Sequence, residues 1–386
     1  MKRLLLLALS PLLLLLPACE KQGGGDAPDG ATTIKIGHYA SMTGSEATFG
    51  QQVDKGIRLA VDEINAAGGI NGKKIELVTE DTQSQTQPSI NAAEKLIGKD
   101  KVVCLLGEVA SSRSLAAADV AQRAKVPMLT PASTNAKVTQ KGDYIYRICF
   151  IDPFQGAVIA RFVSENLKAR SVAILKDQGS DYSVGLSDGF KQTFAQLGGT
   201  IVEEQSYVGT DKDFRAQLTA IKARNPEAII VPGYYTSVGL IAAQARELGI
   251  TAPLVGGDGW DSPDLATGQA KQALEGCYFT NHYAVDDTAA VVQEFNRKYQ
   301  AKWNEVPGAM SALGYDAMNI VVGIIRDAGG KSDPETIRNG LAKLSGYAGV
   351  TGLISINQER NASKSIVIIQ IKDGKFVYHT KFAPQG

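Results

Sequence analysis

Small hydroxyl residues stand directly after two short apolar segments of the chain. Ser111 follows residues 102–106 within Gly107–Ser112, and Thr134 ends Thr130–Thr134 after the next apolar segment. Such segments predict buried parallel strands, whose carboxyl ends share one sheet edge with helix amino ends. Hydroxyls beside the unpaired N–H groups of helix amino ends suit a carboxylate ligand. Each group alone also fits helix N-capping, but two on neighbouring strands favour an anion site.

A different set of side chains follows the apolar segments of the second half of the chain. Asp258 lies in the glycine-rich run Gly256–Asp261, while Tyr182 and Tyr234 follow two other apolar segments. An acid and aromatic rings together suit an ammonium group. The alternatives are an ordinary turn residue for Asp258 and half-buried packing for the tyrosines. With the hydroxyl groups of the first half, this set predicts an amino acid bound between two parts of the protein.

Strand and helix patterns alternate in two successive runs, which predicts two α/β lobes with mainly parallel sheets flanked by helices. The second run begins after Asp152-Pro153. The expected strands are 34–40, 74–78, 102–106, 126–129, then 171–175, 200–202, 228–231, 254–255 and 277–279. The expected helices are 53–67, 88–97, 112–124, then 186–197, 214–221 and 240–248.

The last hundred residues have a different pattern. Three helices are expected at 289–303, 309–328 and 334–344, followed by strands at 352–356, 366–371 and 376–378, the last two joined by a hairpin turn. This tail is too small for a third domain, so we expect it to complete the lobes already begun. The predicted division is 34–150 plus 280–350 for lobe 1, and 151–279 plus 351–386 for lobe 2.

The amino-terminal segment is typical of an export signal. Lys2 and Arg3 precede a leucine-rich run that is shorter than a membrane-spanning helix and leads to Cys19. We expect residues 1–19 to be a lipoprotein signal peptide ending at the lipidated Cys19, and residues 20–33 to be a flexible linker. The alternative is an ordinary signal peptide that happens to end near a cysteine. Either predicts an extracytoplasmic protein of the cell envelope, anchored to the membrane by lipid in the first case.

Composition excludes several classes of function. Forty basic residues balance forty acidic ones, so no nucleic-acid surface or polybasic membrane patch is indicated. Three scattered histidines and no paired cysteine motif argue against a metal site, and no cofactor is predicted. Cys104, Cys149 and Cys277 each lie in an apolar run, which favours buried small hydrophobes, although one disulfide stays possible.

Catalytic motifs are present only in incomplete form. Gly185–Gly189 matches G-x-S-x-G, but Ser187 lies within a helical stripe rather than on a turn between strand and helix. Gly72-Lys73 and Gly330–Ser332 lack the first glycine of a phosphate-binding loop. The sequence therefore predicts a binding protein and not an enzyme, with a hydrolase using Ser187 as a minor alternative.

Several motifs together resemble the periplasmic branched-chain amino-acid-binding proteins, the Leu/Ile/Val-binding type of ABC-transporter substrate-binding protein. The resemblance covers nearly all of residues 34–377. Its markers are Ile36-Gly37, Thr43-Gly44, Phe49-Gly50, Asn65–Gly72, Thr130–Thr134, Asp181-Tyr182 with Gly185, and Gly314–Ala317. The resemblance implies a two-lobed type I periplasmic binding protein with three hinge crossovers, which closes on its ligand.

The resemblance also implies roles for individual residues. Ser111, Ala132 and Thr134 would hold the ligand carboxylate, and Asp258 the ammonium. Tyr182, Tyr234, Phe49 and Met310 would surround the rest of the ligand. The implied function is an extracytoplasmic solute-binding lipoprotein of an ABC importer, a monomer that binds a small, aliphatic or branched-chain amino acid and delivers it to a permease with its ATPase subunits. The alternatives are a sensory binding protein of the same fold, or a binder of an amide, urea-like or aromatic acid ligand.

Overall fold

The protein is described here by a computed structural model that covers residues 32–384. The expected signal peptide, Cys19 and most of the expected linker lie outside the described residues. Among residues 32–384, no helix combines the length and the apolar character that crossing a membrane requires. The described chain contains two large sheets and one small one.

The first large sheet contains five strands in the order β2-β1-β3-β4-β5, all parallel to their neighbours. Its strands are apolar and largely buried at the centre, as expected for a sheet covered on both faces. They are β1 (Thr33–Ala40), β2 (Lys74–Asp81), β3 (Leu105–Gly107), β4 (Met128–Thr130) and β5 (Ile145–Arg147).

The second large sheet contains seven strands in the order β15-β14-β10-β9-β8-β6-β7. The five strands from β10 to β7 are parallel, whereas β14 and β15 run antiparallel at the other edge. The strands are β6 (Ser171–Asp177), β7 (Thr200–Tyr207), β8 (Ala228–Ile230), β9 (Leu254–Gly256), β10 (Tyr278–Asn281), β14 (Ile366–Lys372) and β15 (Lys375–Phe382). The tail therefore completes a sheet begun by the middle of the chain.

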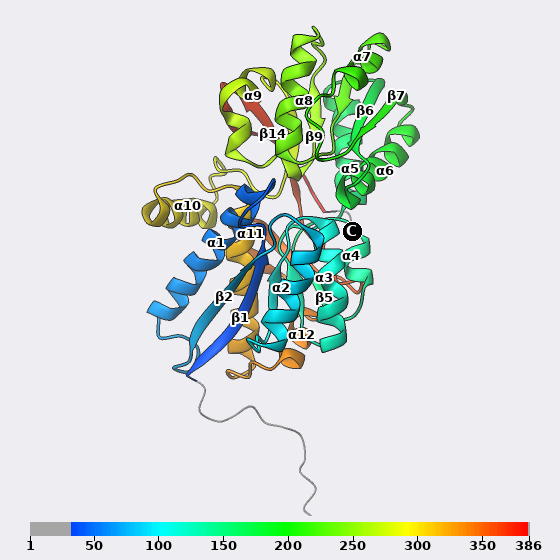
Figure 1. Ribbon diagram of the computed structural model, residues 1–386. Helices are drawn as coiled ribbons and strands as arrows, with labels where there is room; N and C mark the ends of the chain where they lie inside the picture. Colours follow the sequence, from blue (N-terminus) through cyan, green and yellow to red (C-terminus); the bar gives the residue numbers. More distant parts are fainter. Residues whose placement is uncertain (1–31, 385–386) are drawn as a thin grey trace, which may run out of the picture. The chain divides into compact units, whose positions relative to one another are not determined.

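Helices flank both large sheets (Figure 1). Two helices far apart in sequence, α1 and α11, lie side by side, because each presents a long apolar stripe to the other. The α-helices are α1 (Ala47–Ala66), α2 (Thr86–Gly98), α3 (Ser111–Ala124), α4 (Lys137–Gln140), α5 (Asp152–Arg161), α6 (Asp181–Gln196), α7 (Arg215–Ala223), α8 (Tyr235–Glu247), α9 (Gly268–Ala273), α10 (Ala290–Trp303), α11 (Ala309–Asp327) and α12 (Pro334–Leu341).

Three short helical segments and a small sheet complete the described chain. The helical segments are the π-helix η1 (Phe162–Asn166) and the 3-10 helices η2 (Asp258–Trp260) and η3 (Pro263–Ala266). The small sheet joins β11 (Tyr347–Gly349), β12 (Gly352–Ile356) and β13 (Ala362–Ser363). Asp316 of α11 accepts hydrogen bonds from the backbone N–H groups of Val350 and Thr351, which ties this sheet to the helix.

The chain passes between the two large sheets three times. The first passage follows β5 and leads to α5, the second follows β10 and leads to α10, and the third follows β13 and leads to β14. Three passages agree with the prediction of two α/β lobes joined by three crossovers. The three cysteines of the described chain, Cys104, Cys149 and Cys277, are free and buried.

Candidate functional site

One small cavity brings together all eight side chains that the sequence predicted for the ligand. The residues come from the ends of strands in both sheets and from the first turns of α1, α3, α6 and α11. Its lining consists of Phe49, Val109, Ser111, Ala132, Thr134, Tyr182, Tyr234, Asp258, Gly259 and Met310. The cavity volume is about 10 Å³, close to the space that one water molecule needs. The walls therefore stand nearly in contact in this arrangement.

On the first-lobe wall, hydroxyl groups and a helix end face the cavity. Ser111 is the first residue of α3, and its Oγ accepts a hydrogen bond from the backbone N–H of Asn135 at 3.2 Å. Thr134 is buried, and its Oγ1 has no partner at hydrogen-bonding geometry among the described residues. Because buried hydroxyls normally have partners, this group fits a polar ligand atom.

The other hydroxyls of the same loops hold the wall together instead. Thr130 Oγ1 donates to the backbone oxygen of Glu108 at 2.6 Å, and Ser133 Oγ lies 2.8 Å from the backbone oxygen of Val109. These bonds join the loop after β4 to the loop after β3. The two loops that carry Ser111 and Thr134 are thus fixed relative to each other.

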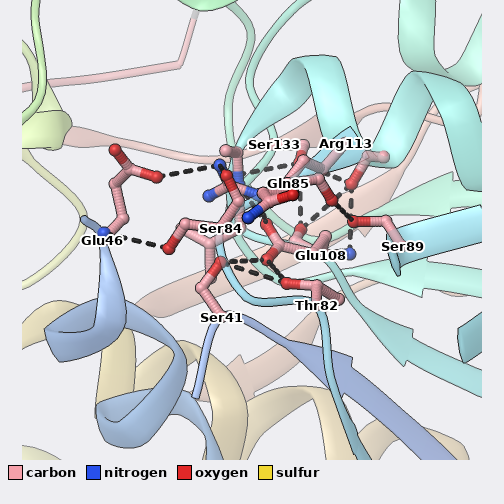
Figure 2. Close-up of polar contacts among 12 residues, drawn as sticks. Ser41, Glu46, Thr82, Ser84, Gln85, Ser89, Glu108, Arg113 and Ser133 are labelled. Atoms are coloured by element: carbon pink, nitrogen blue, oxygen red, sulfur yellow. Dashed lines mark hydrogen bonds and ion pairs between the residues drawn. The ribbon is translucent and has the colours of Figure 1, made fainter. Parts of the chain in front are cut away.

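A buried ion pair lies behind this wall (Figure 2). Glu108 accepts hydrogen bonds from Ser41 Oγ at 2.6 Å and Thr82 Oγ1 at 2.8 Å, and its Oε2 lies 3.1 Å from Arg113 Nε. Arg113 Nη1 also donates to Glu46 at 2.8 Å. Burial would raise the pKa of Glu108, but Arg113 and the hydroxyl donors hold it below its usual value. The charges of this cluster are therefore paired with one another.

A second buried cation supports the loop that carries Thr134. Arg147 of β5 is fully buried, and its guanidinium donates to the backbone oxygens of Ser133 at 2.5 Å and Asn135 at 2.8 Å. Burial lowers the pKa of Arg147 from its usual value. The first bond holds the peptide group between Ser133 and Thr134, and the second holds the peptide group after Asn135, so together they set the direction of the Thr134 N–H.

On the second-lobe wall, one carboxylate carries the charge. Asp258 is 2 % exposed; its Oδ1 accepts from Gln155 Nε2 at 2.8 Å, and its Oδ2 lies 3.0 Å from His282 Nε2. Burial lowers the pKa of His282 to about 4, although Asp258 opposes this shift. At neutral pH the imidazole is therefore uncharged, and both partners of Asp258 are neutral. Neither partner is a cation, so the carboxylate is available to a ligand ammonium.

Aromatic side chains from both lobes form the rest of the cavity lining. Tyr182 and Tyr234 stack with ring centroids 5.1 Å apart and an interplanar angle of 13°, and Phe49 meets Tyr234 edge-on at 5.9 Å. Tyr182 also accepts a hydrogen bond from the backbone N–H of Gly259 at 3.0 Å. Burial raises the pKa of Tyr182 and of Tyr234 well above the usual value, so both phenols are neutral. The rings and Met310 offer an apolar surface to a ligand side chain.

Close packing explains why glycine occurs in the loop after β9. A Cβ at Gly257 would overlap the side-chain oxygen of Gln155 and the hydroxyl of Tyr182. Glycine thus lets the backbone beside Asp258 approach both side chains. Trp260 ends the same turn and is buried, with Nε1 donating to the backbone oxygen of Val231 at 3.0 Å.

Comparisons with known proteins agree with this geometry. Residues 33–375 match the family model described as periplasmic binding protein. A leucine-binding protein from Thermotoga maritima is 40% identical, with a TM-score of 0.87 over 91% of this chain and 99% of that one. A branched-chain amino acid transporter substrate-binding protein from Streptococcus pneumoniae, solved with isoleucine, is 36% identical, with a TM-score of 0.85 over 91% and 100%.

A Leu/Ile/Val-binding protein from Rhizobium johnstonii is 32% identical over 91% of this chain and 95% of its own length. The chain belongs to the periplasmic branched-chain amino-acid-binding family. This confirms both the resemblance drawn from the sequence motifs and the type I two-lobed fold. Members of this family are solute-binding proteins of ABC transporter systems, and the family name places them outside the cytoplasm.

A second, larger cavity of this binding protein lies beside the passage from β10 to α10. It has a volume of about 510 Å³ and includes Asp261, Tyr283, Val306 and Phe376 in its mostly apolar lining. Asp261 accepts hydrogen bonds from Asn281 and from the backbone N–H of Ala309, so its carboxylate is already occupied. The smaller cavity is the candidate site because all eight predicted residues line it, including the unpartnered hydroxyl of Thr134.

Two contacts of this binding protein were missed by sequence reasoning. Gln155 and His282 hold Asp258, and the sequence patterns gave neither residue a role. The position of His282 directly after β10 was the available signal; Gln155, within α5, gave none. Ser187 lies inside α6 and is buried, as its helical pattern predicted. Among residues 32–384, no cluster of His, Cys, Asp and Glu has the arrangement of a metal site.

Proposed function

We propose that this protein is the extracytoplasmic solute-binding component of an ABC importer, and that it binds an aliphatic, branched-chain amino acid between its two lobes. The observation that carries the proposal is the convergence of Ser111 and Thr134 from one lobe and Asp258 from the other on one cavity. Neutral donors suit a carboxylate, and the uncompensated acid suits an ammonium. A zwitterion has both groups on one carbon atom.

The apolar part of the cavity supports an aliphatic side chain. Phe49, Tyr234 and Met310 line the cavity beside the polar groups and would surround the ligand side chain. Apolar burial favours each added methylene by about 0.8 kcal/mol. We expect leucine, isoleucine and valine to bind more tightly than alanine for this reason.

Binding would proceed by closure of one lobe onto the other. Polar contacts already link the lobes in this structure: Tyr235 donates to the backbone oxygen of Ser45 at 3.1 Å, and Ser112 Oγ donates to Asp181 at 2.8 Å. A ligand favours the closed form only through contacts that improve on closure. Asp258 and the two stacked tyrosines would supply those contacts, and the closed form would dock on the permease.

The amino-terminal segment, the lobe boundaries and the transport partners complete the proposed function. We propose that Cys19 is lipidated and anchors the protein to the membrane, and that residues 20–33 serve as the linker. We also propose lobe boundaries at 34–150 plus 280–363 and 151–279 plus 364–386; the last boundary differs from the expected residue 350 because β12 and β13 precede the third passage. The protein would act as a monomer with a permease and its ATPase subunits.

A ligand screen tests the proposed function. The purified full chain is titrated with the twenty amino acids, acetamide, urea and 4-hydroxybenzoate, and binding is followed by thermal shift and calorimetry. A ligand that binds only the folded state raises the melting temperature by mass action. We expect the largest shifts with leucine, isoleucine and valine. Stabilisation by compounds without an amino group alone would reject the proposal in favour of an amide, urea-like or aromatic acid ligand.

A further inference from the structure

The acid of the second-lobe wall is joined to the hinge through one histidine. His282 is the first residue after β10, on the second passage between the sheets. Its Nε2 lies 3.0 Å from Asp258 Oδ2, and its ring stacks on Phe150 with centroids 3.8 Å apart and an interplanar angle of 15°. Phe150 belongs to the first passage. Two of the three passages therefore meet at the partner of Asp258.

The contacts of the imidazole define which nitrogen carries the proton. An ionised carboxylate has no proton to donate, so the 3.0 Å contact requires a hydrogen on His282 Nε2. The second ring nitrogen, Nδ1, is buried without a hydrogen-bond partner among the described residues. The ring is 3 % exposed and its stacking on Phe150 prevents rotation. This arrangement presents one fixed N–H to Asp258.

From this geometry we infer that His282 is a positioning residue for ammonium recognition: its Nε2–H holds the Asp258 carboxylate aimed into the cavity. The inference rests on the proposed function, because it assigns a role within the same site. Without that donor, Asp258 keeps only Gln155 as a side-chain hydrogen-bond partner, and its carboxylate is free to turn away from the ligand ammonium.

The neutral state of His282 is essential to this role. A protonated imidazolium would neutralise Asp258 and compete with the ligand ammonium. The charged groups that face the ring are Asp258 from η2 and Lys364 from the third passage, and they act in opposite directions. Burial outweighs the attraction of Asp258 and lowers the pKa of His282 to about 4, so the ring stays neutral at envelope pH.

The test compares two ligands that differ only in the amino group: leucine and 4-methylpentanoate. The removal of the donor in His282→Met should weaken leucine binding by about ten-fold or more, the cost of a hydrogen bond to a charged group. Binding of 4-methylpentanoate should not weaken, because that compound does not use Asp258. His282→Gln restores a donor at a similar reach and should recover most of the leucine affinity.

A second readout separates positioning from packing. Phe150→Leu changes the packing of the imidazole but keeps the Nε2–H donor, so its leucine affinity should stay close to that of the wild type, in contrast to His282→Met. The wild-type chain labelled with ¹⁵N-histidine contains three histidines, and His282 should show the Nε2–H tautomer. That measurement does not depend on the folding of any variant or on the affinity of 4-methylpentanoate.

The outcomes distinguish this inference from the proposed function. Equal losses for both ligands in His282→Met, unchanged leucine affinity, or an Nδ1–H tautomer would overturn the role of His282 while leaving amino acid binding intact. A wild-type protein that binds none of leucine, isoleucine and valine would instead reject the proposed function itself.

Discussion

The two walls of the cavity treat buried charge in different ways. Behind the first-lobe wall, Glu108 is paired with Arg113 and with hydroxyl donors, so its charge is compensated before any ligand arrives. On the second-lobe wall, Asp258 has two neutral partners, Gln155 and His282. Burying an unpaired charge is costly, so Asp258 retains a strong attraction for a cation. The first wall is thus a rigid frame, and the second wall carries the attractive charge.

This difference separates stability from affinity. Residues of the compensated cluster should matter mainly for the free energy of unfolding, because their partners are all internal. Residues of the uncompensated wall should matter mainly for ligand binding, because part of their interaction is made with the ligand. Substitutions on the two walls therefore test whether stability and affinity are separated in this way.

The largest effect is expected from Arg113→Met. This change leaves Glu108 buried without its cation, and loss of one member of a buried pair costs roughly 3–5 kcal/mol of folding stability. Urea unfolding measures the loss. The matched control is Arg215→Met, since the pair of Arg215 with Glu247 is half exposed and should contribute about 0–1 kcal/mol. Equal small losses in both variants would contradict the rigid-frame interpretation.

The next largest effect should come from Asp258→Asn. Removal of the charge without a change in shape should weaken leucine binding by roughly 1.5–3 kcal/mol while the fold is retained. Isothermal titration calorimetry measures the affinity, and the exposed Asp213→Asn serves as the control. Asp258→Asn with wild-type affinity would mean that the second wall carries no attractive charge.

Lys364 is a buried lysine near His282, and the pH dependence of stability tests whether it carries a positive charge in the folded protein. Burial lowers the pKa of Lys364 to about 8, and its Nζ donates to Thr351 at 2.6 Å rather than to Asp258. Between pH 8 and 10.5 the unfolded chain binds more protons than the folded chain at this residue, so its contribution to the free energy of unfolding increases with pH. The gain is at most about 1.4 kcal/mol per pH unit.

Unfolding of the wild type and of Lys364→Met at pH 8, 9 and 10 measures this contribution as a difference. The stability of the wild type should increase relative to the variant across the series. A constant difference would show that Lys364 keeps its charge in the folded state, and then Lys364 would need a buried acid as its partner.

A smaller effect is expected from Thr134→Val, which removes a hydroxyl while keeping the shape of the side chain. Because Thr134 Oγ1 has no partner among the described residues, the fold should lose little, and leucine affinity should fall by roughly 1 kcal/mol. The informative control is Thr130→Val, whose hydroxyl holds the Glu108 backbone. That variant should lose stability instead. The reverse pattern would contradict the assignment of the two hydroxyls.

The smallest effect should follow from Tyr235→Phe. Its hydroxyl donates to Ser45 across the lobes and accepts from the backbone N–H of Thr48 at 3.3 Å. Loss of these contacts should weaken leucine binding by roughly 0.5 kcal/mol, because they help the closed form only. Small-angle X-ray scattering with and without leucine would show a reduced closed population. An increased affinity would mean that this contact favours another arrangement.

The sequence predicted most of the fold because its strands and helices are strongly patterned. The helices α10, α11 and α12 begin and end within a few residues of their predicted bounds, and the hairpin of β14 and β15 was expected from its turn. The missed elements include β5 and α5, besides shorter ones such as α4, α9, β11 and β13. β5 has only three residues, and α5 is buried around much of its surface, so neither shows a periodic boundary between polar and apolar positions.

The residues that line the candidate site could be predicted because the carboxyl ends of parallel strands lie at the same edge of a sheet. The eight predicted residues all line the cavity because each follows a strand or opens a helix. The supporting groups were not predictable in the same way. Arg147 lies within a strand and Gln155 within a helix, and their partners are close in space but separated along the chain, with no pattern that links them. Only the three-dimensional packing brings them to the loops that they hold.

The strand order has a consequence for how the chain folds. All strands of the first sheet lie within residues 33–147, but α10, α11 and α12, which cover that lobe, follow the whole parallel part of the second sheet. The last strand of the parallel part of the second sheet, β10, then pairs with β14, about ninety residues later. Neither lobe can reach its final packing until almost the entire chain is available. Folding of the two lobes should therefore be kinetically coupled, with a single slow phase rather than one phase for each lobe.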